Sequence, residues 1–259
     1  MHNFFYNSKL GQNFLIDSKI IDKIISSICP KKYDFMVEIG PGLGALTYPI
    51  CNILKQLVVI EYDKKLGSKL FNNLDNVKVF INDALKFDFF NLTRYSDKKI
   101  RMIGNLPYNI SVSLLIYLFQ FSDKIIDIHF MFQKEVADRL LAIPGTKSYG
   151  CLSIITQYYF TVQWLFNISP DSFYPKPNVF STLVRLIPCR IKKFYVKDIN
   201  ILSYITKLAF SQRRKKIKNS LSSLFDIDAL QKFSINPNLR AEDLSLEQYC
   251  LLSNIIRTK

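Results

Sequence analysis

Histidine is scarce in this 259-residue sequence, and paired metal-ligand motifs are missing. Only His2 and His129 could offer imidazole ligands, and none of the five cysteines belongs to a CxxC pair, so we expect no metal site. So little histidine also argues against a hydrolase that uses histidine as its general base. The odd number of scattered cysteines fits reduced thiols in a cytosol better than a disulfide framework.

Long hydrophobic runs are missing too. The longest apolar stretches, such as Leu114 to Phe119, fall far short of the roughly 20 residues that cross a bilayer. No basic segment leads into an apolar core at the N-terminus, as it would in a signal peptide. We therefore expect a soluble cytoplasmic protein. Hydrophobic residues still make up 49% of the chain, which indicates a packed core and a globular structure throughout.

Acidic residues are outnumbered: 35 Lys and Arg face 21 Asp and Glu, which gives a formal net charge of +14. Such a charge favours polyanionic partners, either a nucleic acid or an anionic membrane, because phosphate contacts release condensed counterions. The abundance of Lys, Ile, Asn and Phe is also typical of an AT-rich genome. Charge alone therefore does not select the partner, and the motifs must decide.

Strands and helices alternate along the first two thirds of the chain. This alternation predicts an α/β fold with a parallel, Rossmann-like sheet covered by helices on both faces. Predicted strands cover residues 35–39, 57–60, 77–81, 100–103, 126–132 and 180–186. Predicted helices cover residues 46–54, 64–72, 113–121, 134–141 and 153–159, and an amphipathic helix is expected within residues 14–28.

After Pro188 the pattern changes, and only helical periodicity remains, at residues 199–211, 213–224, 227–233 and 246–257. We expect two domains: a catalytic α/β domain over residues 1–189 and a small all-helical domain over residues 190–259. The basic stretch 190–193 would connect them.

A glycine-rich segment, Glu38 to Gly44, separates the first predicted strand from a helix, where glycines allow a sharp turn and close approach to a ligand. Glu61 ends the next strand and could accept hydrogen bonds from both hydroxyls of a ribose, and Asp83 follows the third strand as a partner for an adenine amine. The glycine spacing departs from the dinucleotide pattern. An adenosine-type donor therefore fits better than NAD, although an isolated glycine run can also form a simple tight loop.

The four residues Asn105-Leu106-Pro107-Tyr108 follow the fourth predicted strand, at the sheet edge where open α/β folds bind ligands. The Asn105 amide oxygen and a backbone carbonyl fixed by Pro107 could accept both hydrogens of an exocyclic amine and align its lone pair on an electrophilic methyl group. Tyr108 would stack on the base. Asn and Pro also favour ordinary turns, so the motif has a purely structural alternative.

Taken together, these motifs resemble the bacterial small-subunit rRNA adenine dimethyltransferase (KsgA, or dimethyladenosine transferase) family over nearly the whole chain. The matching segments are residues 9–15, 38–47, 105–111, 133–137, 172–179 and 209–215. The resemblance implies a class I methyltransferase fold and S-adenosylmethionine as the donor. It also implies dimethylation of two adjacent adenosines in a hairpin loop near the 3′ end of small-subunit rRNA, within a pre-formed ribosomal particle, as a step of ribosome biogenesis. We expect a monomer.

The resemblance also assigns residues to the cofactor. Asn13 and Leu15 would line its methionine end, Gly40 and Gly42 would form the glycine loop, and Asn105 would lie at the reactive centre. Glu61 would hold the ribose and Asp83 the adenine.

Two further assignments concern the RNA. Phe173 could stack on the opposite face of the flipped base, or it could be a core phenylalanine. The basic stretch 213–218 would contact rRNA phosphates from a helix beside the catalytic cleft, or it could form a solvated helix face. Its cations are Arg213, Arg214, Lys215, Lys216 and Lys218.

Two alternatives remain. The first is a large-subunit rRNA adenine methyltransferase of the Erm type, which shares the fold, the donor and a similar Asn-x-Pro-Tyr motif; the stretch 210–215 favours the small-subunit family. The second is a non-catalytic RNA-binding assembly factor with the same fold, against which the intact Glu61, Asp83 and Asn105 argue.

Overall fold

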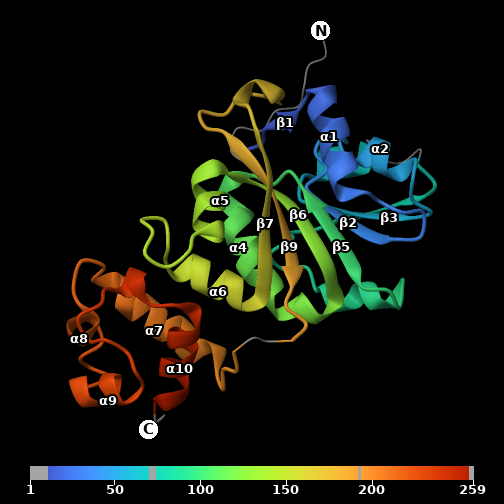
Figure 1. Ribbon diagram of the computed structural model, residues 1–259. Helices are drawn as coiled ribbons and strands as arrows, with labels where there is room; N and C mark the ends of the chain where they lie inside the picture. The colour runs from blue at the N-terminus through green and yellow to red at the C-terminus, as the bar shows by residue number, and fades with distance from the viewer. Residues whose placement is uncertain (1–10, 70–73, 192–193, 257–259) are drawn as a thin grey trace. The chain divides into compact units, whose positions relative to one another are not determined.

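The computed structural model describes residues 11–69, 74–191 and 194–256 (Figure 1). They form two compact units: unit 1 takes residues 1–137 and 163–188, and unit 2 takes residues 138–162 and 189–259. The predicted domain boundary at residue 190 lies beside the last of the three points at which the chain passes from one unit to the other, but unit 2 also includes residues 138–162. Lys9 and Leu10 of the first family segment, Lys192 and Lys193 of the predicted connection, and the ends of predicted helices 64–72 and 246–257 lie outside the described residues.

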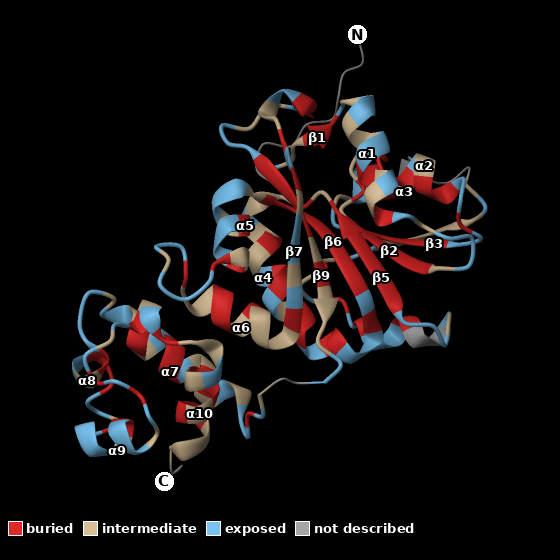
Figure 2. Cartoon of the chain, in the orientation of Figure 1, coloured by how far each residue is buried: buried red, intermediate tan, exposed pale blue. Residues whose placement is uncertain are grey.

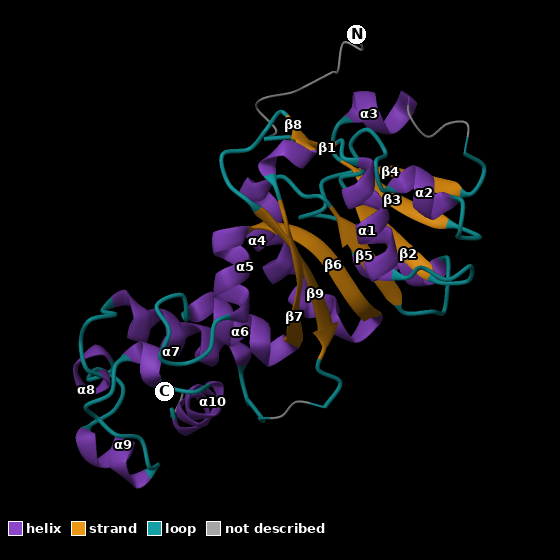
Figure 3. Cartoon of the chain, turned by 45° about the horizontal axis from the view of Figure 1, so that its top comes forward, coloured by secondary structure: helices purple, strands orange, loops and turns teal. Residues whose placement is uncertain are grey.

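A seven-stranded sheet forms the centre of unit 1, in the order β4-β3-β2-β5-β6-β9-β7 (Figures 1 and 3). The first five strands in this order, from β4 to β6, are parallel to one another, whereas β9 runs antiparallel to β6. The strands are β2 (Phe35–Ile39), β3 (Leu57–Glu61), β4 (Val77–Ile81), β5 (Ile100–Gly104), β6 (Ile125–Gln133), β7 (Phe160–Ile168) and β9 (Ser181–Pro188). The predicted Rossmann-like class is confirmed, with a mostly rather than wholly parallel sheet.

The central strands are buried along their whole length. Every residue of β2, β3 and β5 is buried (Figure 2), which requires helices on both faces of the sheet. Side chains on one face of the sheet, such as Met36 and Val59, share a hydrophobic cluster with α1 (Ser18–Ile28) and α2 (Thr47–Cys51). On β6 packs α4 (Tyr108–Leu118). Two more helices, α3 (Lys64–Lys69) and α5 (Lys134–Leu141), follow β3 and β6.

The N-terminal segment differs from its prediction as one amphipathic helix. Asp17 caps α1, accepting hydrogen bonds from the amides of Lys19 (3.0 Å) and Ile20 (3.3 Å), so the helix begins only at Ser18. Upstream, Phe14 and Leu15 form strand β1, which pairs antiparallel with β8 (Phe173–Tyr174). Residues 14 and 15, just before the cap, are therefore extended and pair with residues that lie far away in the sequence.

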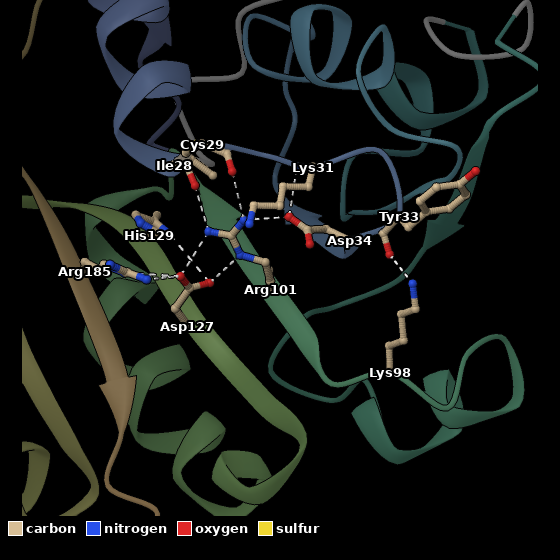
Figure 4. A network of polar contacts seen from close by, with 10 residues as sticks. All are labelled: Ile28, Cys29, Lys31, Tyr33, Asp34, Lys98, Arg101, Asp127, His129 and Arg185. Carbon is tan, nitrogen blue, oxygen red and sulfur yellow. Dashed lines mark hydrogen bonds and ion pairs between the residues drawn. The ribbon is translucent and has the colours of Figure 1, made fainter.

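A buried ion-pair network fastens the other end of α1 to the sheet (Figure 4). The Arg101 guanidinium on β5 donates to both carboxylate oxygens of Asp127 on β6, to Asp34, and to the carbonyl of Ile28 at 2.7 Å. Arg185 on β9 also donates to Asp127, at 2.8 Å. Burial raises the pKa of Asp127, but its hydrogen bonds with Arg101 and Arg185 outweigh this and leave the pKa below its usual value. Asp127 is thus ionised and balances two cations.

Unit 2 has its own hydrophobic core, in which α6 (Cys151–Tyr159), α7 (Ile199–Ser211) and α10 (Leu246–Ile255) pack together. Two shorter helices, α8 (Ile217–Ser220) and α9 (Ile227–Lys232), complete it. The predicted helix 213–224 is wrong over most of its length. Residues 213–215 form a turn and Lys216 bridges to Arg240, because consecutive like charges and the contacts of Arg213 described below oppose a continuous helix. Within the described ranges, no helix combines the length and apolar character needed to cross a membrane.

Candidate active site

The loops that follow β2 and β5 meet at one edge of the sheet. These strands are adjacent and parallel, with Glu38 opposite Ile103, so Gly40 and Asn105 emerge side by side. The approach is close, because a Cβ atom on Gly104 would lie 2.8 Å from the carbonyl oxygen of Ile39. Only glycine fits at that position without displacing the neighbouring loop.

A first cavity lies between these two loops and the N-terminal segment. Its lining includes Asn13, Leu15, Gly40, Gly42 and Asn105, together with Glu38 and Glu61. Six residues that the sequence assigned to the cofactor therefore line one cavity. Gly40 and Gly42 both have positive φ, +64° and +56°, a conformation that side chains other than glycine rarely adopt.

Glu61 connects this cavity to a second one. One of its carboxylate oxygens accepts the Gly42 amide at 3.2 Å and the other accepts the Asp63 amide at 2.8 Å. Its burial raises the pKa above the ordinary value. The second cavity, about 180 Å³ in volume, is lined by Glu61, Asp83, Leu106 and Pro107 among others, and shares Gly40, Glu61 and Pro107 with the first. The two cavities are neighbours: the residues predicted for the methionine end line the first, Asp83 lines the second, and Glu61 lines both.

Glu38 is a site residue that the sequence reasoning did not single out. It lines the first cavity, it is only 2% exposed, and its Oε2 has no hydrogen-bond partner among the described residues. Burial raises its pKa to about 8. The signal was present in the sequence: an acidic residue inside an otherwise apolar strand, two residues before Gly40.

Asn105 is oriented by the N-terminal segment. Its side-chain amide nitrogen donates to the backbone carbonyl of Asn13 at 2.7 Å, which leaves Oδ1 as the acceptor atom of the carboxamide. Tyr108, at the start of α4, shares a 2.6 Å hydrogen bond with the Ser181 hydroxyl. Asn13 and Tyr108 also line an open cleft, bounded on the other side by residues 175–179. Asn105 thus lies in the first cavity beside a residue, Asn13, that faces both spaces.

Phe173 belongs to the core. Its side chain is 2% exposed, it pairs through its backbone with Leu15, and it joins the hydrophobic cluster of unit 1. It does not appear in the lining of the two cavities or of the open cleft. In this conformation it supports Leu15 and does not present a face to a base, while the adjacent Tyr174 is 53% exposed.

The basic stretch 213–218 lies in unit 2. Arg213 donates to Glu242 at 2.8 Å and to the carbonyls of Thr146 and Lys147, so its guanidinium is held by unit 2 itself. Arg214 and Lys215 lie on the turn after α7, and Lys218 lies on α8. Lys216 contacts Asn238 at 3.3 Å.

Comparison with known proteins shows the family to which the chain belongs. A family profile described as ribosomal RNA adenine dimethylase matches residues 3–258. The chain belongs to this family. The motif-based resemblance is therefore confirmed, as is the prediction of an S-adenosylmethionine-dependent rRNA adenine methyltransferase.

Relatives within the ribosomal RNA adenine dimethylase family are close. The chain is 61% identical, over 98% of its length and 97% of the relative's, to ribosomal RNA small subunit methyltransferase A of Buchnera aphidicola subsp. Baizongia pistaciae. It is 45% identical to the protein of the same name from Klebsiella pneumoniae (strain 342), over 95% of this chain and 91% of that one.

Solved structures agree on the fold. A dimethyladenosine transferase from Plasmodium falciparum superimposes with a TM-score of 0.79 at 25% identity, covering 92% of this chain and 95% of that chain. The 23S rRNA methyltransferase ErmE gives a TM-score of 0.71 at 21% identity, over 93% and 98% of the two chains, which is a likeness of fold alone. The sequence relatives thus support the small-subunit assignment and neither of its two alternatives.

Proposed function

We propose that this enzyme dimethylates two adjacent adenosines in the hairpin loop near the 3′ end of small-subunit rRNA. It acts as a monomer on a pre-formed ribosomal particle, and this modification is a step of ribosome biogenesis. The proposal rests on one observation above all: Asn105 lines the donor cavity, and its side-chain nitrogen donates to the carbonyl of Asn13, a residue that lines both this cavity and the open cleft.

The residues of the two cavities fit S-adenosylmethionine. The donor carries a positive sulfonium and a positive ammonium, and the cavities contain Glu38, Glu61 and Asp83. One carboxylate oxygen of Glu38 is fully buried and has no hydrogen-bond partner in the part of the chain that the structure describes, and a cation would satisfy it. Glu61 and Asp83 would hold the ribose and the adenine, while Asn13, Leu15, Gly40 and Gly42 would surround the methionine end. When bound, the donor supplies an electrophilic methyl group.

The chain's own groups prepare the nucleophile. An adenine amine is weakly nucleophilic because its lone pair is delocalised into the ring. Asn105 Oδ1 and the Leu106 carbonyl, whose direction Pro107 fixes, would accept its two hydrogens and hold the nitrogen nearer tetrahedral geometry. Tyr108, fixed by Ser181, would stack on the base. No general base is needed before the transfer, because the amine attacks in its neutral form.

Contacts with the rest of the particle would come from the cations of residues 213–218. Arg214, Lys215, Lys216 and Lys218 are candidates for phosphate contacts, whereas Arg213 would act by holding the loop that carries them.

Small-subunit particles lacking the modification test this function. Purified enzyme and methyl-labelled donor should yield dimethyladenosine in digests of the small-subunit rRNA, with little product on protein-free rRNA. Label confined to large-subunit rRNA, or equal activity on protein-free RNA, would contradict the substrate proposed.

A further inference from the structure

Charge divides the candidate site into two regions. The two donor cavities contain Glu38, Glu61 and Asp83 and, among the described residues, neither lysine nor arginine. The open cleft beside Asn13 and Tyr108 shows the opposite sign, because Lys176 is the one charged residue among those described in its lining. An acidic region suits a cationic donor, and a basic one suits a polyanionic substrate.

Lys176 forms an ion pair with Asp171. Its ammonium lies 2.5 Å from Oδ1 of Asp171, and the two side chains are 63% and 75% exposed. The hydrogen bond from Lys176 lowers the pKa of Asp171, so the carboxylate is charged at neutral pH. An ion pair this exposed to water is weak, and an incoming anion can replace the carboxylate.

The backbone on either side of Lys176 is conformationally restricted. Pro175 and Pro177 flank it, and each proline ring restricts its own φ. Both prolines line the cleft together with Lys176. Asp171 is held in place as well. The Ser169 hydroxyl donates a 3.2 Å hydrogen bond to its carboxylate and thereby keeps it near the Lys176 ammonium.

We propose that Lys176 binds a phosphodiester group that flanks the target adenosine, and that Asp171 competes with this phosphate for the ammonium until RNA arrives. The inference rests on the proposed function, since a base that leaves its stack to enter the cleft brings its own flanking phosphates to the rim. A lysine ammonium suits this contact, because it is a compact charge that binds phosphate in many orientations.

Opposite effects of two substitutions test the proposal. Lys176→Gln should raise the KM for small-subunit particles roughly threefold to tenfold and reduce the salt slope of binding by about one. Asp171→Asn should lower that KM about twofold or more, because the competitor is gone. The double variant should match Lys176→Gln, since Asp171 acts only through Lys176. Donor affinity and kcat at saturating particle concentration should stay unchanged in all three.

Matched variants separate this contact from general charge and from folding. Lys124→Gln removes an exposed cation before the start of β6, at the end of the strand opposite to the cleft residue Gln133, and should leave KM nearly unchanged. Lys176→Arg keeps the charge and should retain most of the particle affinity. Thermal unfolding of every variant should remain close to that of the wild type.

An unchanged KM for Lys176→Gln would overturn the inference, as would a raised KM for Asp171→Asn, because the pair would then serve only the turn between residues 169 and 176. Failure of the proposed function looks different. In that case the wild-type enzyme itself forms no dimethyladenosine on small-subunit particles.

Discussion

The side-chain nitrogen of Asn105 donates a 2.7 Å hydrogen bond to the backbone carbonyl of Asn13, 92 residues earlier in the chain. Asn13 directly precedes β1, whose strand partner β8 leads into the turn that carries Lys176. One hydrogen bond therefore links the reactive amide to the segment that closes the donor cavity. We expect donor binding and amine orientation to depend on each other for this reason.

Gly104→Ala should disturb the meeting of the two loops. Its Cβ would lie 2.8 Å from the Ile39 carbonyl oxygen, and overpacking of this kind costs roughly 1–3 kcal/mol. We expect a lower Tm together with weaker donor binding, measured by thermal unfolding and calorimetry. Gly150→Ala is the matched control, because its Cβ would meet nothing within 4 Å and its φ of −173° suits any residue. Equal Tm and equal donor affinity for the two variants would show that the site does not need the close approach of the two loops.

Glu38 should make stability depend on pH. Its pKa is raised from 4.5 to about 8, so over this range the folded protein keeps a proton that the unfolded chain has lost. The contribution of this proton to the free energy of unfolding is fully present below the pKa of Glu38 in the unfolded chain. It is lost as pH rises through the pKa of Glu38 in the folded protein. Glu38→Gln cannot ionise, so its Tm advantage over the wild type should grow between about pH 5 and pH 8. Parallel Tm curves for the two proteins would contradict the raised pKa.

The same substitution should have the opposite effect on donor binding. A cationic donor beside Glu38 favours the ionised carboxylate, so wild-type binding near pH 7 should release protons, seen as a dependence of calorimetric heat on the buffer's ionisation enthalpy. Glu38→Gln should bind the donor more weakly and release fewer protons. Unchanged affinity with unchanged proton release would remove Glu38 from the donor site.

Arg213 should behave differently from the cations that follow it. Its guanidinium bonds with Glu242 and with loop carbonyls, so Arg213→Lys should lower Tm, and in a double-mutant cycle its effect should be coupled to that of Glu242→Gln. Lys215→Gln and Lys218→Gln should instead raise the KM for particles with Tm unchanged. Equal loss of particle affinity with no change in Tm for Arg213→Lys would place Arg213 on the RNA.

Local patterns in the sequence predicted much of this fold. Strands β2 and β4 have the predicted bounds, because short apolar runs flanked by turn residues are unambiguous in a parallel sheet. Strand β7 was missed, although Phe160, Val162, Trp164, Phe166 and Ile168 alternate along it. The strand follows α6 directly, so no turn residues mark the place where it begins.

The parts of the site that local patterns could not predict depend on distant residues. Phe14 and Leu15 have helical spacing to the residues of α1, but pairing with residues 173 and 174 makes them a strand. The same pairing buries Phe173. In the sequence, Arg213 begins a run of cations that predicts a helix, and only the fold brings Glu242 beside its guanidinium. That Gly40, Glu61 and Asn105 lie near one another could be predicted, because each lies at or just after the end of a strand of the same sheet. Asn13 and Leu15 were assigned by the family resemblance alone.

Asn105→Ala tests the central claim most directly, measured as dimethyladenosine formed on small-subunit particles by mass spectrometry of digested rRNA, alongside particle binding. Removing the amide should reduce methyl transfer about a hundredfold or more and leave particle binding largely intact. Asn91→Ala, which truncates an exposed asparagine bonded to Asp88, should retain full activity. Methyl transfer by Asn105→Ala at the wild-type rate would contradict the role assigned to this amide.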